Sequence, residues 1–360
     1  MGLLSFFACQ ICAQTKRDNT VIPEESLTTT GWLARFVEGQ DCPLTESQWY
    51  LSATRRMCAE PAHPIRDKEI DCLLGFINTV HSEIVALVKR GGTYVNGQTT
   101  QIKDITHDRQ GNTVERIVYG FDFNYQRHVD SRVVYTYDGQ GRATGWEDYA
   151  NGRPVPAKSI YRYDRRGNRI TETVTQADGK IRAVLTLIYD AKRQNIEKRY
   201  EHPGLSPNLS RLVNVYDGKG NLIQTSAFNA EGKLLSKSVA SFDAKGNRIE
   251  VESYGVNSNQ EVVLRNKTSY EYDDKGVKTG IQIYGSDGGL CNKVLYQYND
   301  HGDLSSITKY ERDGTFGGRS VFEYEYDSRG NWTKCTHLHQ RTETSLPEAY
   351  YTENRTLTYY

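Results

Sequence analysis

Residues 160–180 read IYRYDRRGNRITETVTQADGK, and the pattern in this stretch recurs along most of the 360-residue chain. An aromatic residue stands directly before Asp164, and Gly167 follows Asp164 by three positions. Asp at the first position of a type I turn accepts a hydrogen bond from the backbone two residues on, and Gly at the fourth position adopts positive φ without a Cβ clash. The stretch therefore predicts two strands joined by a tight, bulged hairpin turn.

The Asp164 position belongs to a repeat that runs along the chain in steps of 26 to 30 residues. The acidic or amide residue of each copy is Asp108, Asp138, Asp164, Asp190, Asp217, Asp243, Asp273, Asn299 or Asp327. Gly stands three residues later in every copy but one, where Arg193 replaces it. Each unit offers a single carboxylate, so these residues are expected to form turns and not to bind calcium or act as catalytic acids.

A second turn signal stands in the same phase. It is a polar residue followed by Gly, twelve residues before the next Asp or Asn, at Asn96-Gly97, Asp178-Gly179, Glu231-Gly232 and Asp287-Gly288. Each unit therefore predicts strand, turn, strand, turn, with strands of roughly eight residues. By the same phase we expect a strand between Asp71 and Lys89, although the apolar residues there also fit a helical stripe.

Tyrosine pairs mark the strands that lead into the turns. Their first members are Tyr135, Tyr161, Tyr270, Tyr296 and Tyr324, each followed two positions later by a second Tyr. A period of two places both members of a pair on one face of a strand. We expect these rings to pack in the core. The alternative is a solvent-facing aromatic strip that stacks on sugar rings, which makes the same five residues candidate ligand-binding residues.

Composition agrees with an all-β protein. Lys and Arg number 45, as do Asp and Glu, so the net charge is zero and no general attraction to nucleic acid is expected. Hydrophobic residues make up only 37%, whereas Tyr numbers 25 and Gly 31, which favours short strands and tight turns. We predict a continuous antiparallel meander of repeated β-hairpins, forming a curved open sheet or a partial β-shell, with a small irregular N-terminal segment.

Three regions follow from this organisation. Residues 1–13 contain an apolar run too short to span a bilayer, which predicts a secretory signal segment. A buried first strand and a lipoprotein lipidated at Cys9 are the alternatives. Residues 14–75 are expected to be irregular, with a possible short helix near 45–57. Residues 76–360 are expected to carry the hairpin repeats and to end in a strand that covers the last open edge.

Seven cysteines constrain the redox chemistry. Cys9 and Cys12 would leave with the signal segment, and an exported protein could form one disulfide among Cys42, Cys58 and Cys72. Because five cysteines then remain, at least one thiol is expected to be free or to pair outside the chain.

Three stretches of the repeat resemble a known family. They are YTYDGQGRATGWEDYANGR (135–153), IYRYDRRGNRITETVTQADGK (160–180) and YEYDSRGNWTK (324–334). They are similar to the YD (RHS-type) repeats of bacterial surface and secreted proteins, over about 250 of the 360 residues. The resemblance implies a continuous antiparallel sheet, which spirals into a hollow shell around a toxin in long members, and an extracytoplasmic setting. Because this chain is far shorter and no toxin domain is recognisable after its last repeat, the resemblance carries over no catalytic residue.

One group of residues has metal-ligand chemistry. Cys335, His337 and His339 form C-x-H-x-H, and on a strand all three side chains would share one face. An evident fourth ligand is missing. We therefore expect these three residues to be exposed polar residues of a strand, and we expect no cofactor. The sequence holds no GxSxG, HExxH or P-loop motif.

Three functions are consistent with these features. The favoured hypothesis is an exported, non-enzymatic repeat protein, periplasmic, cell-surface or secreted, which binds a glycan, a cell-wall polymer or a surface protein. It is expected to bind no nucleic acid and to have no transmembrane segment. The alternatives are a small metal-dependent enzyme that uses the Cys335–His339 region, and a structural remnant of a toxin-delivery repeat shell.

Overall fold

The structure is a computed structural model that describes residues 73–149, 157–202 and 209–360. Within these ranges it contains twenty β-strands and no helix. The strands are β1 (Ile77–Arg90), β2 (Thr93–His107), β3 (Thr113–Phe121), β4 (Arg127–Tyr137), β5 (Ala143–Asp148), β6 (Ala157–Tyr163), β7 (Arg169–Thr175), β8 (Ile181–Tyr189), β9 (Asn195–Glu201), β10 (Arg211–Tyr216), β11 (Leu222–Phe228), β12 (Leu234–Phe242), β13 (Arg248–Val256), β14 (Val262–Tyr272), β15 (Lys278–Gly285), β16 (Leu290–Tyr298), β17 (Leu304–Tyr310), β18 (Phe316–Tyr326), β19 (Trp332–Gln340) and β20 (Glu348–Tyr359).

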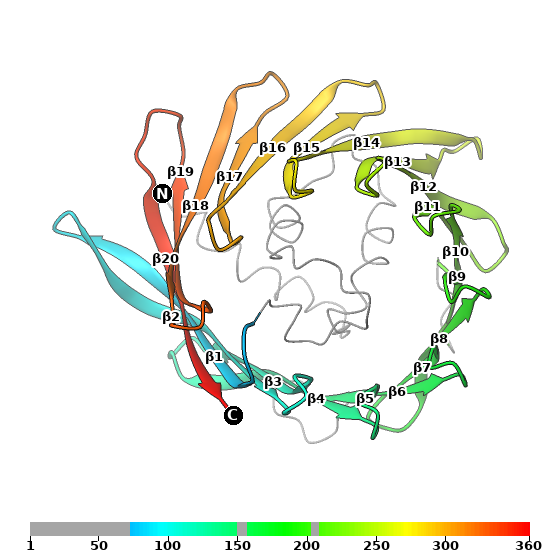
Figure 1. The fold of residues 1–360 in the computed structure, drawn as a ribbon, viewed down its shortest axis with the longest axis horizontal. Coiled ribbons are helices and arrows are strands. Elements are labelled where there is room, and N and C mark those ends of the chain that lie inside the picture. The colour runs from blue at the N-terminus through cyan, green and yellow to red at the C-terminus, as the bar shows by residue number, and fades with distance from the viewer. Residues whose placement is uncertain (1–72, 150–156, 203–208) are drawn as a thin grey trace.

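The sheet closes into a barrel, which corrects the expected open sheet or partial shell. Every strand pairs antiparallel with the next, and β20 pairs with both β19 and β1 (Figure 1). Val80 lies opposite Leu357 at this seam, and the amide of Tyr360 donates to the carbonyl of Phe76 at 3.0 Å. An open edge would expose a row of unpaired backbone groups, and closure removes both edges at once. The C-terminal strand thus lies over the last edge, as predicted, and joins it to the first.

The predicted turn chemistry is confirmed at the first turn of the repeat. The Asp164 carboxylate accepts hydrogen bonds from the amides of Arg166 at 2.9 Å and Asn168 at 2.8 Å. Gly167 has φ of 82° and donates its amide to the Asp164 carbonyl at 3.1 Å. Arg193 holds the same left-handed conformation, with φ of 67°, in the one copy that lacks Gly. The conformation is therefore imposed by the turn and not by the glycine alone.

The second turn is confirmed in three of the four predicted positions. Gly179, Gly232 and Gly288 all lie in turns with positive φ. The prediction for Asn96-Gly97 is wrong, because both residues lie inside β2, where Asn96 is opposite Leu87. The reversal is made instead by Gly91 and Gly92, which have φ of 58° and 86°. Adjacent glycines supply the two positive φ angles of a type I′ turn, so β1 and β2 extend past the expected turn. The strand expected between residues 71 and 89 is β1.

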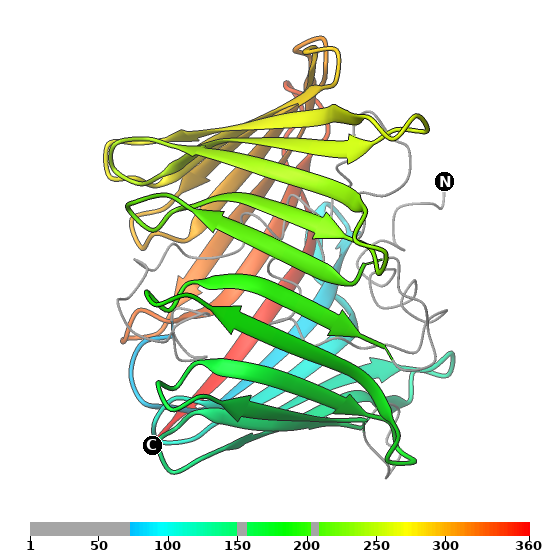
Figure 2. The same ribbon diagram turned by 90° about the vertical axis from the view of Figure 1, so that its right-hand side faces the viewer.

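One face of the sheet forms an inner wall. Leu73, Ile77, Val80 and Ile105 make a buried cluster, and the blue segment that leads into β1 lies inside the ring in Figure 1. Directly paired residues share a face. Successive strand pairings therefore extend the inner wall from Val80 and Ile105 around all twenty strands. Figure 2 shows the strands inclined across the wall, as barrel closure requires.

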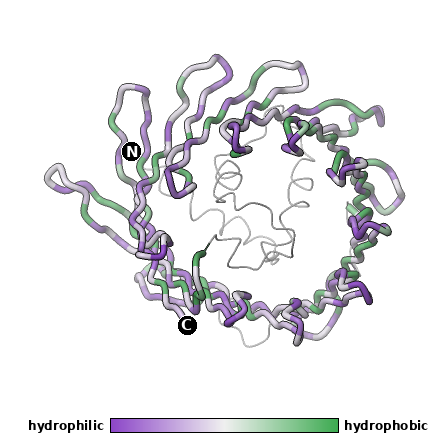
Figure 3. The backbone as a smooth tube through the Cα atoms, viewed as in Figure 1, coloured by the Kyte–Doolittle hydropathy of each residue, from purple (hydrophilic) through white to green (hydrophobic). Residues whose placement is uncertain are grey.

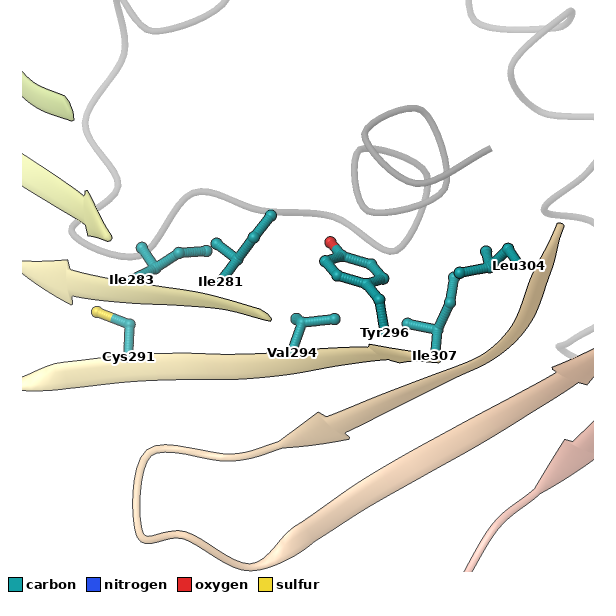
Figure 4. Close-up of a cluster of buried hydrophobic side chains, with 7 residues drawn as sticks. All are labelled: Ile281, Ile283, Cys291, Val294, Tyr296, Leu304 and Ile307. Carbon is teal, nitrogen blue, oxygen red and sulfur yellow. The ribbon is translucent and has the colours of Figure 1, made fainter. Parts of the chain in front are cut away.

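A second buried cluster lies on the inner wall at β15, β16 and β17. Figure 4 shows its side chains on one side of these strands. Its members are Ile281, Ile283, Cys291, Val294, Tyr296, Leu304 and Ile307. The hairpin turns are largely hydrophilic, whereas hydrophobic positions are spread along the strands (Figure 3). The core is therefore a lining distributed along the wall.

The predicted signal segment at 1–13, the short helix near 45–57 and the disulfide among Cys42, Cys58 and Cys72 lie outside the described residues. Within the described ranges, no helix is long and apolar enough to cross a membrane.

Candidate functional site: the inner wall

The five candidate tyrosines all lie on the inner wall. Tyr135 pairs with Trp146, Tyr161 with Glu172, Tyr270 with Ile281, Tyr296 with Ile307 and Tyr324 with Cys335. Tyr296 is buried and the other four are half-buried. Their neighbours are largely side chains of the buried lining, so the arrangement supports core packing over a strip on the outside of the protein.

The second tyrosine of several pairs explains why Tyr precedes Asp in the repeat. The hydroxyl of Tyr137 donates to the carbonyl of Thr113 at 2.6 Å, and Tyr163 donates to Ala143 at 2.6 Å. Tyr272 donates to the carbonyl of Arg248 at 2.9 Å. In each case the acceptor stands five residues after the turn aspartate of the preceding repeat. Asp thus closes its own turn, whereas the Tyr beside it joins that turn to the hairpin before it.

Cations cover several of these rings. The Arg169 guanidinium lies 4.6 Å from the ring centroid of Tyr161, and Arg248 and Lys278 both lie 5.3 Å from that of Tyr270. Burial lowers the pKa of Lys278. Burial also raises the pKa of Tyr298 to about 12, so this phenol stays neutral at physiological pH. The wall is therefore aromatic and carries cations in partly dehydrated positions, where cation–π attraction is strongest.

Acidic residues on the inner wall were not predicted from the sequence. Asp148 is buried opposite Val133, and burial raises its pKa to about 6. One Asp148 carboxylate oxygen and the indole nitrogen of Trp146, two positions earlier, are buried and have no hydrogen-bond partner among the residues that the structure describes. Glu172 is also buried and accepts a hydrogen bond from the Ser159 hydroxyl at 2.9 Å. No sequence motif marks these residues. Only the alternation of inward and outward side chains, followed from Tyr135 to the neighbouring strands, could have predicted that they face inward.

The proposed metal-ligand residues share one face of β19, as predicted. The expectation that they are exposed is wrong for Cys335 and His337, which are buried among aromatic rings. Cys335 is opposite Tyr324 and Glu353, and burial raises the pKa of its thiol to about 12. The His337 ring stacks on Phe322 with centroids 5.1 Å apart, and burial lowers its pKa to about 4. His339 meets the ring of Tyr350 edge-on at 5.8 Å. In the part of the chain that the structure describes, no cluster of three His, Cys, Asp or Glu residues could hold a metal ion.

The two described cysteines differ in oxidation state. Cys291 is disulfide-bonded, and Cys335 has a free, buried thiol. The other half of the Cys291 disulfide therefore lies outside the described residues. The free thiol of Cys335 agrees with the expectation that at least one thiol stays free or pairs outside the chain.

The outer wall carries ion pairs between neighbouring strands. Lys158 pairs with Glu147 at 2.6 Å, Arg132 with Glu115 at 2.7 Å, Lys267 with Glu250 at 3.2 Å and Lys334 with Glu325 at 2.7 Å. These pairs lie on neighbouring strands and are partly exposed. Each exposed pair contributes little to stability, but together they show that the outer surface carries paired charges on β3–β6, β13–β14 and β18–β19.

Comparison with known proteins gives only distant likenesses. No family model and no curated protein matches the chain. The crystal structure of TcdB2-TccC3-Cdc42 is similar with a TM-score of 0.34 and 11% identity, over 77% of this chain and 16% of that chain. A porin-like protein from Bacteroides uniformis has a TM-score of 0.31 and 8% identity, over 78% of this chain and 96% of its own. A porin-like protein from Bacteroides vulgatus has a TM-score of 0.30 and 11% identity, over 65% of this chain and 95% of its own. This chain thus spans about a sixth of the toxin-complex chain, and all three likenesses are too slight to indicate a function.

Proposed function

We propose that this protein is a non-enzymatic, extracytoplasmic shell of the YD-repeat type, whose closed barrel holds a polypeptide against its inner wall. The observation that carries this proposal is the closure between β1 and β20, which turns the aliphatic and tyrosine-rich face inward. Apolar surface gains free energy when another apolar surface covers it. A closed wall lined in this way is suited to enclose a chain of mixed apolar and polar side chains.

The charged outer wall supports a shell in water. A strand surface in contact with lipid presents an apolar band, and a Lys or Arg near the bilayer centre costs about 2–4 kcal/mol. Here Lys158, Arg132 and Lys267 lie on the outside in ion pairs with acidic partners. Solvent can hydrate these groups at little cost, whereas lipid would have to accommodate all of them.

The disulfide at Cys291 supports an extracytoplasmic setting. Disulfides persist in oxidising compartments and are rare where glutathione and thioredoxin keep thiols reduced. The predicted signal segment at 1–13 leads to the same compartment.

The surroundings of the candidate residues favour a shell over the two alternatives. A catalytic or metal-binding cysteine acts as a thiolate, and the raised pKa of Cys335 keeps its thiol protonated. A sugar-stacking ring needs one open face, whereas Tyr161 and Tyr270 have cations over theirs on the inner wall. A bound polypeptide presents apolar side chains and polar backbone groups along its length, and this wall offers apolar and polar partners for both.

The proposal is tested by comparing the two faces of β12. Ser238 pairs with Thr225 and Ser253 on the inner wall, and Lys237 lies on the outer wall, 5.0 Å from the ring centroid of Tyr254. In a Cys335→Ala background, each position is replaced in turn by cysteine, as Lys237→Cys and Ser238→Cys. The rate of reaction with a polyethylene-glycol maleimide is then measured.

An enclosed and occupied wall predicts that Ser238→Cys reacts at least tenfold more slowly than Lys237→Cys. Unfolding in urea should make the two rates equal, which shows that the thiols are chemically alike. Equal rates in the folded protein would refute the shell. A stoichiometric metal ion in the purified protein would instead support the metal-dependent enzyme.

A further inference from the structure

We propose that the occupant of the inner wall is this chain's own segment before β1, tied to the wall by a disulfide between Cys291 and either Cys42 or Cys58. This inference rests on the proposed function and names the polypeptide that the shell holds. It follows from the position of Cys291, from the entry of the chain at Leu73 and from the distribution of cysteines.

Cys291 lies on the inner wall in the middle of an apolar surface. It is 5% exposed and belongs to the cluster with Ile281, Ile283 and Val294 (Figure 4). A chain joined to its sulfur must lie against these side chains. The disulfide therefore fixes where on the wall the other segment docks.

The partner of Cys291 can be narrowed by elimination. Cys335 is free, and residues 150–156 and 203–208 contain no cysteine. The remaining cysteines are Cys9, Cys12, Cys42, Cys58 and Cys72. All five precede β1, so the partner belongs to the N-terminal part of the same chain. Cys9 and Cys12 fall in the predicted signal segment and would be removed with it.

Cys72 is too far from Cys291 to be the partner. Leu73 is buried beside Ile77 and Val80, and the next Cα along a chain is about 3.8 Å away. From β1 to β16 there are five strand-to-strand steps through β20, β19, β18 and β17. Steps of about 4.8 Å place the two strands roughly 20 Å apart, whereas a disulfide joins Cα atoms less than about 7 Å apart. Cys42 and Cys58 remain, and the 15 residues from Cys58 to Leu73 can span about 50 Å when extended.

The segment before β1 enters on the correct side of the wall. The amide of Leu74 donates to the Asn331 side-chain oxygen at 2.7 Å, and the Asn331 amide nitrogen donates to the Leu74 carbonyl at 2.8 Å. These bonds hold the chain against the start of β19, inside the ring (Figure 1). The N-terminal segment thus has one attachment at Leu74 and a second at Cys291.

The covalent step is an ordinary thiol–disulfide exchange. The thiols of Cys291 and of Cys42 or Cys58 each lose a proton, and one Sγ–Sγ bond forms. The two electrons reduce a disulfide oxidant of the extracytoplasmic compartment, whose own S–S bond is broken and takes up the two protons. Of the five cysteines left after removal of residues 1–13, Cys335 stays reduced, and the two not used here are available to each other.

Peptide mapping of the full-length protein tests the link directly. The protein is alkylated without reduction, digested with trypsin and analysed by mass spectrometry. The peptide 279–293, which contains Cys291, is expected in covalent linkage to 36–55 with Cys42 or to 57–66 with Cys58. Reduction should separate the pair. An alkylated Cys291, a link to the Cys72 peptide or a link to a second chain would each overturn the proposal.

Docking is tested by limited trypsin digestion of the full-length protein. The Cys291→Ser variant should be cut at Arg55, Arg56 and Arg66 at least tenfold faster than the wild type. Cys335→Ser removes a thiol that forms no disulfide and serves as the matched control. Far-ultraviolet dichroism verifies that both variants keep the sheet. Equal cleavage of the wild type and Cys291→Ser in folded protein would contradict docking through this bond.

The two proposals fail separately. If Cys291 is unlinked but Ser238→Cys stays shielded, the shell holds some other polypeptide. If the link is found but Ser238→Cys and Lys237→Cys react alike, the disulfide exists in a barrel that does not enclose its wall.

Discussion

The hydroxyl of Tyr163 donates a hydrogen bond of 2.6 Å to the backbone carbonyl of Ala143, twenty residues earlier in the chain. Tyr163 stands directly before Asp164, whose carboxylate binds the amides of its own turn. The two neighbouring residues thus have different roles. Asp164 stabilises its own turn, and Tyr163 fixes the distance between successive hairpins. Their combination accounts for the Tyr–Asp signature without any ligand.

Removing the hydroxyl alone should weaken the barrel measurably. Tyr163→Phe is expected to lower the free energy of unfolding by about 1 kcal/mol, because the Ala143 carbonyl loses its partner. Urea denaturation followed by fluorescence measures the change. Tyr94→Phe, on the β1–β2 hairpin outside this pattern, is the control and should change stability by less than about 0.5 kcal/mol. Equal effects of the two substitutions would show that the Tyr163 bond is energetically unimportant.

A glycine should stabilise the turn that contains Gln260. This residue has φ of 64° and stands where Gly167 and Gly232 stand in other turns. Because a side chain in the left-handed region costs about 1–2 kcal/mol, Gln260→Gly is expected to raise the free energy of unfolding by about 1 kcal/mol. Gln260→Ala retains the Cβ and should give no gain. Thermal denaturation of the pair checks this, and a gain from alanine equal to that from glycine would assign the effect to the glutamine side chain.

Asn331, at the seam where β1 and β20 close the barrel, should contribute more to stability than Asn247, which holds the equivalent position in an ordinary repeat. Both residues stand four positions after a turn aspartate, but the Asn331 side chain also bonds both backbone groups of Leu74 and the hydroxyl of Tyr359 at 3.0 Å. Asn331→Ala is expected to cost about 2–3 kcal/mol, against about 1 kcal/mol for Asn247→Ala.

Hydrogen exchange locates the effect of the Asn331 substitution. Faster exchange should appear first in β1 and β20, whose pairing closes the barrel. Uniform loss of protection around all strands would mean that the seam is no weaker than the rest of the wall.

Asp148 should destabilise the folded protein at neutral pH. Burial raises its pKa to about 6, so the folded state holds a proton that the unfolded state releases near pH 4. Stability therefore falls as pH rises between about 4 and 6, by up to about 3 kcal/mol. Asp148→Asn removes this titration and is expected to stabilise the protein at pH 7 and to have little effect at pH 3.5. Urea midpoints at the two pH values test this, and an effect of equal size at both would exclude the ionisation as its cause.

His337 should have the opposite effect on the pH dependence of stability, because its contribution is lost as the pH falls. Burial against Phe322 lowers the pKa of His337 to about 4 in the folded protein. Between pH 6.5, the ordinary pKa of histidine, and pH 4, the unfolded chain therefore binds a proton at this residue that the folded chain does not bind. The contribution of a neutral His337 is complete above about pH 6.5 and is lost as pH falls toward 4, by about 3 kcal/mol. His337→Gln should flatten this part of the stability profile. His128→Gln, which replaces a half-exposed histidine on β4, is the control.

The turns were predictable because their causes are local. Asp164, Gly167 and the amides between them lie within five residues, so the conformation follows from the stretch itself, and the repeat of that stretch predicts the meander. The error at Asn96-Gly97 arose from the same reliance on local signals. Gly91 and Gly92 compete for the same reversal, and β1 and β2 gain additional ladder hydrogen bonds when the turn forms there.

The candidate site was only partly predictable. Alternation places Tyr135, Tyr161, Tyr270, Tyr296 and Tyr324 on a common face, but it does not say whether that face is turned inward. The buried acids Asp148 and Glu172 carry no motif, and only their cross-strand neighbours identify them. The spacing of a metal-binding motif does place three side chains on one face of β19, those of Cys335, His337 and His339. However, aromatic rings on β18 and β20 occupy the space around them.

The sequence by itself determined that this chain folds back and forth into short antiparallel strands, because a few neighbouring residues, often an aspartate or asparagine with a glycine three positions later, set most of the reversals. The tertiary structure alone decided that the ribbon closes, that the tyrosines face inward and that Cys291 is disulfide-bonded whereas Cys335 is free. Closure depends on the summed twist, tilt and stagger of twenty strands, and it brings together Val80 and Leu357, which no local pattern connects.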